Sequence, residues 1–201
     1  MADRLTDTVV FGADLGLNRP GFSRIHLKKD DGIWHINSVT VMSVDNKSKQ
    51  KNMKKQRGEK LAEIADSFIR FVADDIENMG RSVPCYFVRE HSINNASFGR
   101  RSGTAARTGI SETVGVMDLQ LWLLQKYAVW DEIYPVTIKK QLTGNHKASK
   151  EEVAEAVRRY VGDMDFKNDD ESDAVAVALA WLIKNDYIEF KKEDDKHGKD
   201  S

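Results

Sequence analysis

The feature that most constrains this sequence is an apolar segment near its C-terminus that begins with acidic residues. Asp170 and Asp173 stand three residues apart, and the run Ala174–Ala180 (AVAVALA) follows without a polar residue. Two acids at this spacing at the start of a helix project from one face. We predict a helix from about Asp170 to Asn185. Asp173 is then a charge at the head of an otherwise apolar helix, which requires a partner when it is buried.

Two further acids stand at the ends of apolar segments. Residues 8–15 (TVVFGADL) have the pattern of a buried strand that ends at Asp14, and Pro84–Glu90 (PCYFVRE) has the pattern of a strand that ends at Glu90. Open α/β sheets place their functional sites at the carboxyl ends of strands. Four carboxylates gathered there would repel one another, and a pair of Mg²⁺ or Mn²⁺ ions would remove the repulsion. The pattern predicts a two-metal site of the kind that clamps a phosphodiester.

Each of these acids has a simpler explanation when it is taken alone. Asp14 fits a turn that continues through Gly16, and Glu90 fits an ion pair with a nearby arginine. Asp170 fits the cap of the last helix, and Asp169 is available for the same role. The four acids in this order, at strand ends and at a helix start, favour a shared metal site over four separate explanations.

The rest of the hydrophobic pattern predicts an α/β fold. Five segments have the pattern of strands: 8–15, 22–28, 33–42, 84–90 and 133–138. Four segments have helical periodicity: 59–79, 105 to about 127, Ser149 to about Tyr160, and 170–185. A turn at 29–32 makes the first strands a meander, and Pro135 suggests that the fifth strand lies at an edge. The order βββαβαβαα is that of a ribonuclease-H-like fold, a mixed five-stranded sheet flanked by helices.

Length and composition fit one domain with a highly charged surface. The chain has 201 residues, of which 40% are apolar and 31% are charged. We expect a single domain over 1–188 and a charged, disordered tail over 189–201. The one cysteine, Cys85, excludes an internal disulfide and a multi-cysteine zinc site. The sequence has neither the pattern of a signal peptide nor an apolar run long enough to span a membrane, so we expect an intracellular protein.

Charge is distributed unevenly along this nearly neutral chain. The formal net charge is −1, and acids gather between Asp163 and Asp173. Between Asn46 and Gly58 there are basic residues and no acid: Lys47, Lys49, Lys51, Lys54, Lys55 and Arg57. Such a segment is either a solvated loop or an arm that contacts nucleic-acid phosphates.

Several of these segments resemble the RuvC family of Holliday-junction resolvases, which belongs to the ribonuclease-H-like superfamily. Asn168–Ala180 (NDDESDAVAVALA) is similar to the family's C-terminal signature, an acid, two residues, then Asp-Ala and alternating aliphatics. Ala13–Gly16 (ADLG) is similar to its first-strand motif, and Val88–Glu90 (VRE) to its strand-end glutamate. Val136–Val153 (VTIKKQLTGNHKASKEEV) is similar to the segment between the second and third acids. The similarity touches most of residues 9–183.

The resemblance implies an endodeoxyribonuclease that acts as a homodimer on four-way DNA junctions. Such an enzyme cuts the two opposed strands and leaves ends that a ligase can seal. The implied ligands of two Mg²⁺ ions, for which Mn²⁺ can substitute, are Asp14, Glu90, Asp170 and Asp173. The resemblance implies neither a small-molecule cofactor nor a membrane partner.

Two lysines and one helix acquire a role through the same resemblance. Lys139 and Lys150 match the family's basic residues near the scissile phosphate, where an ammonium group can neutralise developing charge. Taken alone, each is an ordinary surface lysine. The helix that ends near 127 carries Trp122 and several leucines, more apolar surface than one face requires. We expect this helix to contribute to the homodimer.

The loop after Glu90 departs from the family, because it is longer. The family inserts an aromatic wedge from this loop, and either Ile93 or Phe98 is available for that role. Phe98 is the better candidate, because an aromatic ring stacks on an unpaired base. Further DNA contacts are expected from the basic residues of 46–58 and from three arginines near the loop: Arg100, Arg101 and Arg107.

Three other functions share parts of this pattern. The sugar-kinase, actin and Hsp70 group uses a similar Asp-x-Gly turn for ATP phosphates, but its two domains need a longer chain and a second phosphate loop. A non-catalytic DNA-binding protein of the same fold would be favoured by the loss of an acid, and all four acids are present. A related nuclease that cuts other branched DNA or structured RNA presents the same phosphate chemistry.

Overall fold

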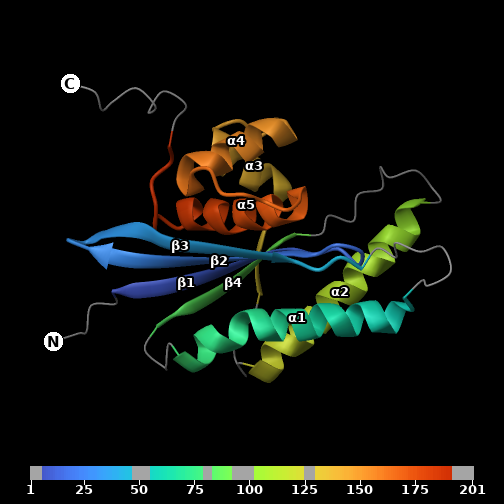
Figure 1. The fold of residues 1–201 in the computed structure, drawn as a ribbon. Coiled ribbons are helices and arrows are strands. Elements are labelled where there is room, and N and C mark those ends of the chain that lie inside the picture. Colours follow the sequence, from blue (N-terminus) through green and yellow to red (C-terminus); the bar gives the residue numbers. More distant parts are fainter. Residues whose placement is uncertain (1–5, 47–54, 79–82, 92–101, 125–129, 192–201) are drawn as a thin grey trace.

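The chain forms a five-stranded mixed sheet with helices on both faces, seen in a computed structural model (Figure 1). The structure describes residues 6–46, 55–78, 83–91, 102–124 and 130–191. The strands are β1 (Asp7–Asp14), β2 (Gly21–Asp30), β3 (Ile33–Ser43), β4 (Cys85–Glu90) and β5 (Trp130–Ile133). Their order across the sheet is β3-β2-β1-β4-β5. The first three strands pair in antiparallel fashion, whereas β4 and β5 are parallel to β1.

The helices divide into two layers. Helices α1 (Arg57–Asn78) and α2 (Ser102–Leu124) lie on one face of the sheet, and α3 (Pro135–Thr143), α4 (Lys150–Val161) and α5 (Asp169–Lys184) lie on the other (Figure 1). Alternate residues of β1 supply the two cores, so that Val10 packs toward α5 while Phe11 packs toward α1. None of the helices in the described ranges is long and apolar enough to cross a bilayer.

Local sequence explains the hairpin that opens the fold. Asp31 and Gly32 both have positive φ, 47° and 88°, as a two-residue turn of type I′ requires. They join β2 to β3 with Asp30 opposite Ile33. The predicted meander of three strands is therefore confirmed, but the turn is shorter than the predicted 29–32, because Lys29 and Asp30 belong to β2.

The segment 133–138 is not a strand, and the prediction there is wrong. The fifth strand ends at Ile133, and Pro135 is the first residue of α3. Proline suits that position because the first N–H groups of a helix have no partner within the helix. Ile138 and Leu142 are the buried residues of α3, four apart, so the apolar pattern belonged to a helix face. The order of elements is βββαβαβααα, with β5 at the edge of the sheet.

The other helices begin near their predicted positions. Ser149 caps α4 and forms the expected capping box with Glu152. The cap of α5 is Asn168, which accepts a hydrogen bond from the backbone N–H of Glu171. Capping is therefore not the role of Asp169 or Asp170, which lie inside the first turn.

The folded part of the chain continues past the predicted boundary at residue 188. The Tyr160 hydroxyl donates to the Glu189 carbonyl at 3.2 Å and accepts from the Lys191 backbone N–H at 2.7 Å. The Lys191 ammonium donates to the Arg159 carbonyl at 3.0 Å. We propose that the domain extends to Lys191; the rest of the predicted tail, 192–201, lies outside the described residues.

We predict that Gly12→Ala strongly destabilises the fold, because β1 and α5 are in direct backbone contact there. A Cβ on Gly12 would lie 2.4 Å from the Ala174 carbonyl oxygen and 2.6 Å from Ser23 Oγ. Overpacking of this kind lowers the free energy of unfolding by roughly 1–3 kcal/mol. Chemical denaturation measures the change.

The matched control is Gly58→Ala, on an exposed part of α1 where a Cβ meets nothing within 4 Å. Alanine favours a helix over glycine by about 1 kcal/mol, so this variant should be as stable as wild type or more stable. Equal stability of both variants would contradict the close packing of α5 on β1.

Candidate metal centre

Asp14 and Glu90 lie side by side at one end of the sheet. Each is the last residue of its strand, and β1 and β4 are parallel neighbours with Ala13 opposite Arg89. Alternate residues face alternate sides, and Val10 and Val88 both pack in the core beneath α5. Asp14 and Glu90 have the same parity as these valines, so both carboxylates face α5.

The other two acids reach this position because α5 is buried across the sheet. Every residue from Ala174 to Ile183 is buried, and the helix packs on β1 and β2 with its N-terminal end at the end of β1. A Cβ on Gly21, which pairs with Asp14, would lie 2.0 Å from the Asp170 carbonyl oxygen. The start of α5, which carries Asp170 and Asp173, therefore lies over the sheet at the end of β1, where Asp14 stands.

The pKa values show that these acids share one electrostatic environment. Burial raises the pKa of Asp14 to about 7, and the charges of Glu90, Asp173 and Asp170 add to the increase. Burial also raises the pKa of Glu90, with a contribution from Asp173. The pKa of Asp173 is raised by burial despite its hydrogen bond with Lys150. The other three predicted ligands are thus close enough for their charges to act on Asp14, and their role as metal ligands stays a prediction.

Two lysines stand beside the acids. Lys150 Nζ is 3.0 Å from the Asp173 carboxylate and 3.4 Å from that of Asp169. Partial burial acts to lower the pKa of Lys150, but the hydrogen bond and charge of Asp173 outweigh it and raise the pKa. Lys139 Nζ donates to the Ala148 carbonyl at 2.6 Å and lies near enough to oppose the increase in the pKa of Glu90.

The donor set fits a hard divalent cation. It consists of carboxylate oxygens, which Mg²⁺ and Mn²⁺ prefer, and their raised pKa values reflect burial and mutual repulsion that a cation would relieve. Within the described ranges, however, no three Asp, Glu, His or Cys side chains are gathered into a ready-made metal cage. Binding a metal at this site therefore requires the carboxylates to turn toward a common point.

An arginine partner does not explain Glu90. The adjacent Arg89 faces the opposite side of the sheet, where its guanidinium donates to Glu132 at 2.8 and 2.9 Å and also pairs with Asp118 of α2. The electrostatic partners of Glu90 are instead Asp173, Lys139 and Lys150. This arrangement supports Glu90 as a member of the acidic site.

Sequence reasoning missed two residues at the site. Arg19, in the turn between β1 and β2, places its Nε 3.6 Å from the Asp170 carboxylate. Glu171 is 1% exposed and contacts β3 rather than the other acids. Arg19 lies within the predicted turn 16–21, so its charge was a visible signal; nothing local indicates the partner of Glu171.

The predicted DNA-binding residues are mostly beyond what the structure describes. Two of the basic residues are described, and both have acidic partners: Lys55 pairs with Glu63, and Arg57 pairs with Glu112 of α2. Acids outside the segment therefore offset the charge of these two residues. The side chains of the remaining predicted contacts lie outside the described residues: Lys47, Lys49, Lys51, Lys54, Phe98, Arg100, Arg101 and Arg107, together with the alternative wedge Ile93.

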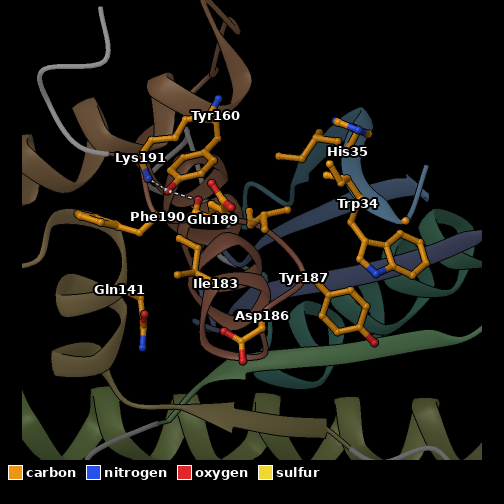
Figure 2. A pocket seen from close by; sticks show the side chains of 14 residues that line it. Trp34, His35, Gln141, Tyr160, Ile183, Asp186, Tyr187, Glu189, Phe190 and Lys191 are labelled. Atoms are coloured by element: carbon orange, nitrogen blue, oxygen red, sulfur yellow. Dashed lines mark hydrogen bonds between the residues drawn. The ribbon is translucent and has the colours of Figure 1, made fainter. Parts of the chain in front are cut away.

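A cleft in the described part of the chain lies away from the acids. It has a volume of about 1100 Å³ and lies between the start of β3, at Trp34 and His35, and the segment after α5, at Tyr187 and Lys191 (Figure 2). These residues are at the C-terminal end of α5, whereas the acids are at its N-terminal end. This cleft is thus separate from the candidate site.

Comparison with known proteins identifies a family. The model of the family "Crossover junction endodeoxyribonuclease RuvC" matches residues 10–181. A crossover junction endodeoxyribonuclease RuvC from Helicobacter pylori (strain Shi470) is 33% identical over 109 residues, which cover 54% of this chain and 67% of the relative. The RuvC of Campylobacter lari is 45% identical over 62 residues, which cover 30% of this chain and 39% of that protein.

Solved structures give the same fold. A Thermus thermophilus RuvC in complex with a Holliday junction substrate superimposes with a TM-score of 0.64 at 19% identity, covering 89% of this chain and 94% of that chain. A second structure of T. thermophilus RuvC gives a TM-score of 0.63, also at 19% identity, over 90% and 98% of the two chains. At this identity the likeness shows the fold alone, and it confirms the predicted ribonuclease-H-like class.

We predict that Mg²⁺ stabilises the protein more strongly in alkaline than in acidic solution. The folded chain keeps a proton on Asp14 up to a pH of about 7, whereas the pKa of an aspartate in the unfolded chain is 3.8. Between these values the folded state binds more protons than the unfolded state, so without metal the free energy of unfolding falls as the pH rises. A divalent cation binds the ionised carboxylates and offsets this loss.

Thermal melting with and without Mg²⁺ checks this expectation. The increase in melting temperature on adding Mg²⁺ should be larger at about pH 8 than at about pH 5, where protons compete with the metal. Asp14→Asn should reduce both the pH dependence and the effect of Mg²⁺. An equal increase at the two pH values would mean that the acids do not bind the ion.

Proposed function

Because this chain belongs to the RuvC family of crossover junction endodeoxyribonucleases, we propose that it resolves four-way DNA junctions by metal-dependent hydrolysis of paired phosphodiester bonds. The observation that supports the chemistry is the convergence of Asp14, Glu90, Asp170 and Asp173 at one end of the sheet, where burial and mutual repulsion raise the pKa of Asp14 to about 7. Isolated surface acids would not interact in this way. A group of carboxylates with shifted pKa values is typical of a functional site.

The four carboxylates would hold two Mg²⁺ ions, for which Mn²⁺ can substitute. When bound, such ions activate a water molecule and stabilise the attacking and leaving oxygens of a phosphodiester. The chain contributes the cations around them: Lys150, which now donates to Asp173, and Lys139, which the Ala148 carbonyl holds in place. We propose that these ammonium groups neutralise charge that develops on the scissile phosphate.

We propose that substrate binding uses the basic segment 46–58 and the loop after Glu90. Phosphate contacts from lysines and arginines would be independent of sequence. Phe98, or Ile93, would stack at the branch point of the junction. Lys55 and Arg57 already pair with acids. The lysines of residues 47–54 are therefore the better candidates for phosphate contacts.

The apolar surface of α2 supports a homodimer. Leu119, Trp122 and Leu123 are 54%, 53% and 61% exposed, while Met117 and Leu121 of the same helix are buried in the core. Large apolar side chains gathered on one exposed helix face are typical of an interface. Two-fold symmetry would match a junction, which presents two equivalent bonds to cut.

We predict that Trp122→Glu combined with Leu123→Glu converts the protein to a monomer, because the dimer would have to bury two charges. Sedimentation velocity at micromolar concentration measures the mass of both proteins. Lys184→Glu, at an exposed position at the end of α5, introduces one such charge elsewhere and should leave the dimer intact. A monomeric wild-type protein would contradict the proposed interface.

We predict that Asp14→Asn abolishes cleavage and leaves junction binding nearly unchanged, because it removes a metal ligand and no basic surface. The rate should fall more than about 100-fold, since even the outer partners of metal ligands contribute 10–100-fold. Cleavage of a synthetic four-way junction in Mg²⁺, and binding of the same DNA in Ca²⁺, measure the two properties.

The control for this variant is Asp163→Asn, the same change at an exposed acid in the turn after α4. It should cut like wild type. If Asp14→Asn cuts the junction at one tenth of the wild-type rate or faster, Asp14 is excluded as a metal ligand. Wild-type protein that cuts a linear duplex of the same sequence as readily as the junction would contradict the proposed substrate.

A further inference from the structure

Glu171 is a buried acid between two predicted metal ligands, yet it has different partners. Its side chain is 1% exposed, whereas those of Asp170 and Asp173 are 29% and 30% exposed. Residues one position apart on a helix point in directions about 100° apart, so Glu171 leaves the face that carries the other two acids. A buried carboxylate without partners would be strongly unfavourable, and its hydrogen bonds therefore indicate what it does.

Glu171 closes a ring of hydrogen bonds between the start of α5 and the end of β3. Ser43 Oγ donates to Glu171 Oε1 at 2.8 Å, and the backbone N–H of Lys167 donates to Oε2 at 2.9 Å. Asn168, the cap of α5, donates through Nδ2 to Ser43 Oγ at 2.9 Å and accepts from the Glu171 backbone N–H at 3.2 Å. We call these three side chains, Ser43, Asn168 and Glu171, the β3–α5 clasp.

The clasp is attached to the sheet at a residue in cross-strand register with Asp14. Asp14 pairs with Gly21 across β1 and β2, and Gly21 pairs with Ser43 across β2 and β3. The Asp170 carbonyl presses on Gly21, at a distance that leaves no space for a Cβ. The first turn of α5 is thus fixed to the sheet at Gly21 and Ser43, in cross-strand register with Asp14.

We propose that Glu171 is a positioning residue, which with Ser43 and Asn168 sets where Asp170 and Asp173 stand relative to Asp14. This inference rests on the proposed function, because it assigns the clasp a role only if the acids bind metal. Helix ends ordinarily fray. The start of α5 would nevertheless have to keep Asp170 and Asp173 in place against repulsion from the other carboxylates. The clasp holds the start of α5 to the sheet from the side of the helix that faces away from the carboxylates of Asp170 and Asp173.

The chemistry of the clasp requires a carboxylate at position 171. Both carboxylate oxygens accept from donors, Ser43 O–H and Lys167 N–H. Ser43 Oγ already accepts from Asn168, so its proton is directed to Glu171. A glutamine would keep one acceptor and turn an NH₂ group toward one of the two donors. Glu171→Gln should therefore lose part of the restraint, and Glu171→Ala should lose all of it.

Mn²⁺ binding to the DNA-free protein, measured by electron paramagnetic resonance, tests the role without relying on catalysis. We expect affinity to fall about tenfold in Glu171→Ala, at the low end for outer partners of a metal site, and less in Glu171→Gln. Ser43→Ala is the decisive variant, because it breaks the clasp while it leaves every charge in place. It should weaken Mn²⁺ binding and lower kcat for junction cleavage, with the affinity for the junction unchanged.

Val72→Ala controls for lost stability. Val72 is fully buried in the core between α1 and the sheet, on the face away from α5. All variants are measured below their melting temperatures. If Ser43→Ala binds Mn²⁺ like wild type, or if Val72→Ala weakens binding as much as Ser43→Ala does, the positioning role is overturned. Wild-type protein that binds no Mn²⁺ would instead overturn the metal site itself, and the positioning role with it.

Discussion

The fold and the site both depend on the burial of α5. From Ala174 to Ile183 this helix is buried against the sheet, and β1 makes room for it with a glycine at position 12. Burying an apolar helix is favourable, at roughly 25 cal/mol for each Å² of apolar surface. Burying the acidic residues at the start of the helix is unfavourable. The same packing that stabilises the domain therefore forces Asp170 and Asp173 toward Asp14 and Glu90. The resulting repulsion between carboxylates is localised where a cation can relieve it.

Much of the site could be predicted because each acid interrupts an apolar pattern. Asp14 and Glu90 end buried strands, and Asp173 begins a buried helix, so their positions follow from periodicity and strand parity. The strand predicted at 133–138 failed, since a short apolar segment with a proline fits an edge strand as well as the start of a helix. Glu171 could not be predicted, because its partner Ser43 is 128 positions away in the sequence.

The two faces of the sheet have separate roles in this account. The face covered by α3, α4 and α5 carries the acids and the lysines of the proposed chemistry. The face covered by α1 and α2 carries the exposed apolar residues of the proposed dimer, and Arg89 links β4, β5 and α2 there by its contacts with Glu132 and Asp118. β4 thus contributes neighbouring residues to both: Glu90 to the site and Arg89 to the opposite layer.

The proposed chemistry requires that α5 and the strand ends together form one metal site. Anomalous diffraction from crystals soaked in Mn²⁺ tests it most directly, because it locates the ion without reference to activity. We expect anomalous peaks between the carboxylates of Asp14, Glu90, Asp170 and Asp173, and their loss in crystals of Asp14→Asn. Peaks elsewhere on the surface, with none among these four acids, would contradict the account.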